Sequence, residues 1–156
     1  MIESLVLALE HSRDLPGVKK GLLTLLGKIK TENPTAQIWF ITGVITAEGP
    51  EFRSRNRELL TRYGEYIRNT RFPFAFSAVD VFSEDLISIV KASGAQGKDF
   101  TPMWIEFINE GKELLTGIIT TPRWQKSPGS ILEVETASNL GLNIVRMENE
   151  LSSLQN

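Results

Sequence analysis

From residue 36 onward, short apolar runs of strand length alternate with longer segments that have the apolar spacing of helices. Short continuous apolar runs bounded by turn residues are typical of strands buried on both faces. Such runs lie at residues 37–42, 72–82 (including an exit loop), 115–120 and 142–147. Helical patterns fall between them, at residues 50–69, at residues 84–92 after a capping serine, at residues 103–114, and over about three turns before Gly141.

Alternation of this kind favours a parallel sheet, because a helix is the usual crossover between parallel strands. We therefore predict an α/β fold, an open and mostly parallel sheet of about four to five strands with helices on both faces, as in flavodoxin-like and Rossmann-like proteins. The length of 156 residues fits a single domain. Within it we expect accessory helices over residues 1–34, the α/β core over 35–147, and a tail or short helix over 148–156.

The first 31 residues carry two helical patterns separated by Pro16-Gly17. Their leucines recur at helical spacing, and Glu32-Asn33-Pro34 ends the second pattern. We expect a helical hairpin that packs either on the core or on a partner subunit.

The composition disfavours several classes of function. The chain has no cysteine and a single histidine, His11, which excludes disulfides and thiolate metal sites and argues against histidine catalysis and multi-histidine metal sites. A formal charge of -2 gives no reason to expect a nucleic acid polymer or a membrane as partner. No stretch approaches the roughly 18 apolar residues of a membrane span, and the N-terminus lacks a basic leader. We expect a cytoplasmic protein with no metal or organic cofactor.

Candidate site residues follow the predicted strands, because ligands in open parallel sheets bind at the carboxyl ends of the strands. Gly43 follows the first strand, and Ser77 and Asp80 lie at the end of the second. In the helix that follows the first strand, Asn56 falls on the apolar stripe, where a polar side chain needs a partner. Its neighbour Arg57 and two nearby arginines supply local positive charge.

The segment from Ser127 to Ser130 lies at the start of the helix that ends before Gly141. Unpaired N–H groups at such an end bind anions, and Gly129 would let a phosphate approach the backbone closely. The alternative is that Ser127 is simply the N-cap residue and Pro128 the first helical residue. The residues leave both interpretations open.

Glu133 lies in the first turn or so of the same helix. There the helix dipole favours a carboxylate and tends to keep it ionised, as a nucleophile requires. Ser130 and Glu133 also have the spacing of a capping box, which needs no ligand. Glu135 points about 200° around the helix from Glu133 and is expected to be solvated.

Six residues here form a W-x2-S-x-G-x3-E-x3-A-x3-G pattern: Trp124, Ser127, Gly129, Glu133, Ala137 and Gly141. This pattern resembles the nucleoside 2-deoxyribosyltransferase-like superfamily, in particular its poorly characterised bacterial and phage branches. The resemblance implies that Glu133 attacks the anomeric carbon of a ribosyl or deoxyribosyl group, that the ligand is a nucleoside or nucleotide, and that subunits pair into a homodimer.

The adjacent pair Asn56-Arg57 resembles a second signature of the superfamily. With the strand-end residues, the predicted site has Glu133 as catalytic residue. Its predicted substrate-binding or phosphate-binding residues are Gly43, Asn56, Arg57, Asp80, Trp124, Ser127, Gly129 and Ser130.

The sequence departs from the superfamily where related branches carry two acidic residues that hold or protonate the base. Thr116 and Ile108 occupy those positions, and neither can transfer a proton usefully at neutral pH. Two functions therefore stay open: an N-glycosidic-bond enzyme, either a 2-deoxyribosyltransferase or an N-glycosidase, and a non-catalytic nucleotide-binding or sensing protein. A third, weaker alternative is an interaction protein that uses its N-terminal helices.

Overall fold

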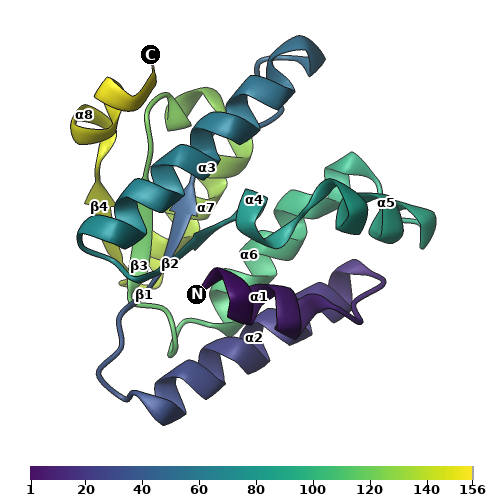
Figure 1. The fold of residues 1–156 in the computed structure, drawn as a ribbon, viewed down its shortest axis with the longest axis vertical. Coiled ribbons are helices and arrows are strands. Elements are labelled where there is room, and N and C mark those ends of the chain that lie inside the picture. The colour runs from purple at the N-terminus through teal and green to yellow at the C-terminus, as the bar shows by residue number, and fades with distance from the viewer. Residues whose placement is uncertain (156) are drawn as a thin grey trace.

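The computed structural model describes residues 1–155 as an α/β protein built on an open, all-parallel sheet. The helices and strands are arranged as Figure 1 shows. The strand order is β2-β1-β3-β4, which is the order of flavodoxin-like sheets. The strands are β1 (Ile38–Thr42), β2 (Phe74–Ser77), β3 (Gly117–Thr120) and β4 (Asn143–Arg146). The predicted fold class is confirmed.

The register brings the carboxyl ends of the strands to one edge. Thr42 of β1 is paired with Thr120 of β3, and Thr120 with Arg146 of β4. From β1 the chain first adds β2 on one side and later adds β3 on the other side. The topology therefore switches between β1 and β3, where open sheets of this kind form a crevice.

Helices cover both faces of the sheet. In Figure 1, α3 (Arg53–Thr70) crosses in front of the strands, and its side chains pack with Trp39, Ile41 and Ile119. Short helix α8 (Glu148–Leu151) and the 3-10 turn Ser152–Gln155 close the same face. The opposite face, which carries Phe40 and Ile118, packs with α1 (Ile2–Leu9), α2 (Leu15–Glu32), α4 (Ala78–Val81), α5 (Glu84–Ala92), α6 (Phe100–Glu110) and α7 (Pro128–Asn139).

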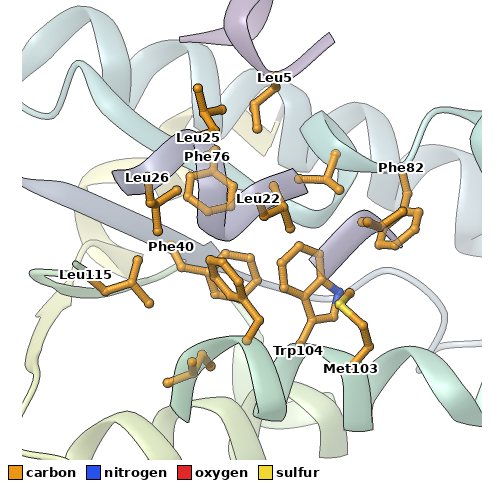
Figure 2. Packing of buried hydrophobic residues seen from close by; sticks show 14 of the residues in the cluster. Leu5, Leu22, Leu25, Leu26, Phe40, Phe76, Phe82, Met103, Trp104 and Leu115 are labelled. Carbon is orange, nitrogen blue, oxygen red and sulfur yellow. The ribbon is translucent and has the colours of Figure 1, made fainter. Parts of the chain in front are cut away.

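The N-terminal helices contribute to the main hydrophobic core. Leu5 of α1 and Leu22 of α2 are fully buried and belong to one cluster with Phe40 and Phe76. Figure 2 shows the leucines of α2 around these two rings. Pro16 does not separate two patterns, because Asp14 caps α2 and Pro16 lies in its first turn, where a missing N–H costs nothing.

Four aromatic rings fill the centre of this core. The Phe40 ring stacks on Trp104 at 4.6 Å, and Phe107 contacts Phe40, Phe76 and Trp104 at 5.6 to 6.4 Å between centroids. Tilted and edge-on contacts of this kind stabilise a core beyond the area that they bury. Phe40 on β1 and Trp104 on α6 also line a cavity at the carboxyl end of β1.

Several element boundaries differ from the sequence prediction. Helix α5 has the predicted bounds, with Ser83 as its cap, but α6 begins three residues before Met103 and ends at Glu110. The 3-10 turn Gly97–Asp99 leads directly into α6, and the Asp99 carboxylate stabilises this turn by accepting from the Gln96 N–H at 2.8 Å. Gly111 ends α6. The helix predicted over residues 50–69 begins with a 3-10 turn, Pro50–Phe52, in which Phe52 is 38% exposed. Among the described residues, no helix has both the length and the apolar character to cross a membrane.

Candidate functional site

A cavity of about 370 Å³ opens at the point where the sheet topology switches. Its volume falls in the roughly 300–1,000 Å³ range of small-molecule pockets. One wall is apolar, with aromatic rings from Phe40, Phe82, Phe100 and Trp104. Polar and charged residues also line the cavity: Thr42, Thr46, Arg53, Arg57, Lys91, Thr101, Ser127, Ser130 and Glu133.

Helix α7 places Glu133 at the wall of this cavity. Its buried residues recur at helical spacing, so that Ser130 and Glu133 lie over the end of β1 while Val134 and Ala137 enter the core. Glu133 is only 7% exposed, and its carboxylate accepts a hydrogen bond of 2.7 Å from the Thr42 hydroxyl. This is a buried acid with one polar side-chain partner, and it lines the cavity.

Burial raises the pKa of Glu133 to about 7, and the hydrogen bond from Thr42 opposes this rise. The expectation that the helix dipole keeps this carboxylate ionised is therefore corrected. Glu133 is the sixth residue of α7, beyond the terminal N–H groups, where the dipole effect has faded and the loss of water dominates. Near neutral pH both protonation states are populated, so the side chain can act as a nucleophile or as an acid.

The raised pKa of Glu133 predicts a pH dependence of stability. Between about pH 4.5 and 7 the unfolded chain has lost this proton while the folded protein keeps it. The free energy of unfolding should therefore fall as the pH rises through this window, by about 3 kcal/mol from this group. Urea unfolding of the wild type and of Glu133→Gln, measured between pH 4 and 8, tests the prediction. The variant should lack this component, and identical pH profiles for both proteins would contradict it.

The start of α7 follows the simpler interpretation of the sequence. Ser127 is the N-cap, its hydroxyl accepts from the Ser130 N–H at 3.2 Å, and Pro128 is the first helical residue. The predicted capping box between Ser130 and Glu133 is wrong, because Ser130 donates instead to the Gly43 carbonyl at 3.2 Å. The Glu133 carboxylate accepts its hydrogen bond from Thr42 instead. Ser127, Gly129 and Ser130 all line the cavity.

Two glycines of the predicted site allow close packing around it. A Cβ at Gly43 would collide with the Thr121 hydroxyl, which donates to the Thr42 carbonyl at 2.8 Å. A Cβ at Gly129 would lie 2.9 Å from the hydroxyl of Thr101 on α6. The absence of a side chain at each position brings loops and helices together at the cavity edge.

Asn56 does not line the cavity and instead joins two loops beside it. Its amide donates to Glu48 at 2.9 Å and to the Ile45 carbonyl at 3.3 Å. Arg123 pairs with Glu48 and donates to the Asn56 oxygen at 3.4 Å, with a left-handed backbone at φ 67°. We call Glu48, Asn56 and Arg123 the loop clasp. The sequence indicated that Asn56 needs a partner but did not indicate which one.

Asp80 and Trp124 also lie outside the cavity lining. The Asp80 carboxylate caps α4 through the Ser77 N–H at 2.8 Å and pairs with Arg68 at 3.0 Å. The Trp124 indole donates to Glu148 at 2.7 Å, which ties the segment before α7 to α8. Of the predicted site residues, the cavity thus brings together Gly43, Arg57, Ser127, Gly129, Ser130 and Glu133.

The structure adds Thr42 to the site. Thr42 is a polar residue at the end of an apolar strand, a position that could have signalled its role. Thr116 accepts from the Ile38 N–H at 3.1 Å, and Ile108 is fully buried in the core. Among the described residues that line the cavity, Glu133 is the one acidic side chain.

Comparison with models of protein families, with curated proteins and with solved structures finds no match for this chain. The function must therefore be argued from the geometry of the site.

Proposed function

We propose that the protein cleaves the N-glycosidic bond of a nucleoside or nucleotide, with Glu133 as the nucleophile. The observation that carries the proposal is a buried carboxylate, held by a single hydroxyl, at a cavity where the topology of a parallel sheet switches. A pKa near 7 is well matched to work at neutral pH. The resemblance of the Trp124 to Gly141 segment to deoxyribosyltransferase-like proteins supports the same chemistry.

The reaction proceeds by double displacement. An ionised Glu133 oxygen forms a bond to the anomeric carbon while the bond from that carbon to the base nitrogen breaks, and the base leaves with the electron pair and takes a proton from water. In the second step a water or another base attacks the anomeric carbon and releases the Glu133 carboxylate. The hydroxyl of Thr42 holds this carboxylate in place, and the aromatic wall with Phe100 and Trp104 gives a nucleobase an apolar surface.

A specific observation favours a second candidate, a protein that binds a nucleotide without turnover. Thr116 and Ile108 leave the cavity without a second acid to protonate the departing base. Such a sensing protein would keep the cavity and its polar edge while the chemical step is lost.

Incubation with a mixed pool of ribonucleosides, deoxyribonucleosides and their monophosphates separates the two candidates. Free base detected by mass spectrometry, in an amount that exceeds the enzyme, supports the glycosidic activity and identifies the substrate. Nucleotide binding by calorimetry without base release would instead support the sensing protein. A homodimer, implied by the resemblance, stays a prediction that analytical ultracentrifugation tests.

A further inference from the structure

Two helices present positive side chains to the mouth of the cavity. Arg53 and Arg57 lie one turn apart on α3 and line the cavity from one side. Lys91 lines it from α5 and makes no ion pair within the described residues. The Arg57 guanidinium is fixed by a 2.7 Å hydrogen bond to the Phe82 carbonyl, and its side chain is only 15% exposed. The function proposed for Glu133 does not use these three charges.

Glu84, the first residue of α5, bridges the two arginines. Its carboxylate accepts from both terminal nitrogens of Arg53, at 2.9 and 3.3 Å, and lies 3.1 Å from Nε of Arg57. Two guanidinium groups around one anion is the arrangement that also binds phosphate oxygens. The Glu84 side chain is 61% exposed, and ion pairs this exposed are weak. A ligand anion can therefore displace Glu84 at little cost.

The positive side chains line the cavity from α3 and α5, whereas Glu133 lines it from α7. The Glu133 carboxylate accepts its hydrogen bond from Thr42 and makes no ion pair within the described residues. A dianion held beside Glu133 would repel the ionised nucleophile, and this separation avoids that repulsion. Residues on three different helices thus line one cavity, an arrangement that suits an elongated ligand with its anionic group at α3 and α5 and its sugar at α7.

We propose that Arg53, Arg57 and Lys91 form a subsite for the phosphate monoester of a nucleotide, and that Glu84 occupies its two arginines until the ligand displaces it. The identification of the ligand as a nucleotide rests on the proposed function. Displacement of Glu84 also releases its tether between α5 and α3, so ligand binding and the position of the cavity wall at Ile87 and Lys91 are coupled.

Calorimetric titration with a nucleoside and its 5′-monophosphate tests the subsite. Every titration uses the full chain with Glu133→Gln, which prevents consumption of the ligand. In this background we expect the monophosphate to bind more tightly than the nucleoside. Adding Glu84→Gln should tighten monophosphate binding about tenfold, because a competing carboxylate is removed from two charged donors, and should leave nucleoside binding unchanged. Adding Arg53→Gln should weaken monophosphate binding selectively.

Asp85→Asn is the matched control, since it removes the same charge from the neighbouring exposed residue of α5, which makes no ion pair among the described residues. The proposal is overturned if Glu84→Gln and Asp85→Asn change monophosphate binding equally, or if no protein binds the monophosphate. Inorganic phosphate and ribose 5-phosphate complete the series. If inorganic phosphate binds as tightly as the monophosphate, the nucleotide is not the ligand.

These outcomes are separate from the failure of the proposed reaction. If the wild type releases no base, but the monophosphate binds more tightly and Glu84→Gln has the expected effect, the subsite is supported and the glycosidic activity is contradicted. If the protein releases base equally from nucleosides and monophosphates, and Glu84→Gln does not change binding, the activity is supported and the subsite is contradicted.

Discussion

Replacing Glu133 with glutamine should lower the rate of base release by about 10⁴-fold or more, the scale of loss when a covalent nucleophile is removed. Glutamine keeps the size of the side chain and still accepts the hydrogen bond from Thr42, but its amide oxygen is a poor nucleophile. The fold should be retained, because within the described residues the carboxylate makes no ion pair and its partner is the Thr42 hydroxyl. Single-turnover measurement of free base, on the substrate that the wild type selects, gives the rate.

Glu135→Gln provides the matched control, since it makes the same chemical change two residues away on the exposed side of α7. This variant should release base at the wild-type rate. Equal rates for the wild type and Glu133→Gln would show that Glu133 is not the nucleophile. A covalent glycosyl adduct on a Glu133 peptide, found by mass spectrometry after rapid quenching, would identify the attacking residue independently.

Replacing Phe107 with alanine should lower the free energy of unfolding by about 3–5 kcal/mol. The ring is fully buried between α6 and the sheet, where it contacts Phe40, Phe76 and Trp104, and neighbours from two strands and a helix cannot all move into the space. Urea denaturation followed by circular dichroism measures the loss. Phe107 does not itself line the cavity.

Phe52→Ala makes the same substitution at a residue that is 38% exposed, where the Arg55 guanidinium lies over the ring at 4.7 Å from its centroid. Its cost should stay within about 1 kcal/mol, as for most surface positions. Similar losses for the two variants would mean that the Phe107 cluster is not the rigid centre of the core.

The secondary structure was largely predictable, because local patterns determine it. The apolar run before Gly43 became β1, and Ser83 caps α5 at the predicted residue. The start of α6 was predicted too late, since the side chain of Asp99 organises a turn inside a segment that has the composition of a loop. The sequence also carried the candidate nucleophile and the polar start of α7, both of which lie at the cavity.

The contacts of the site were not predictable in the same way. Thr42 and Glu133 are 91 residues apart, and no local pattern links them. Asn56 signalled a missing partner, yet only the folded loops supplied Glu48 and Arg123. Arg57 was expected beside the ligand, but its carboxylate partner Glu84 was not expected.

The sequence by itself determined which segments form strands and helices, and through their alternation the parallel sheet and the edge at which a site can form. Periodicity encodes this information, because a side chain's position along a helix or strand sets its face. Only the tertiary structure decided the raised pKa of Glu133, the loop clasp and the pairing of Glu84 with two arginines. These depend on burial and on distances between residues far apart in the chain, which exist only once the elements have packed.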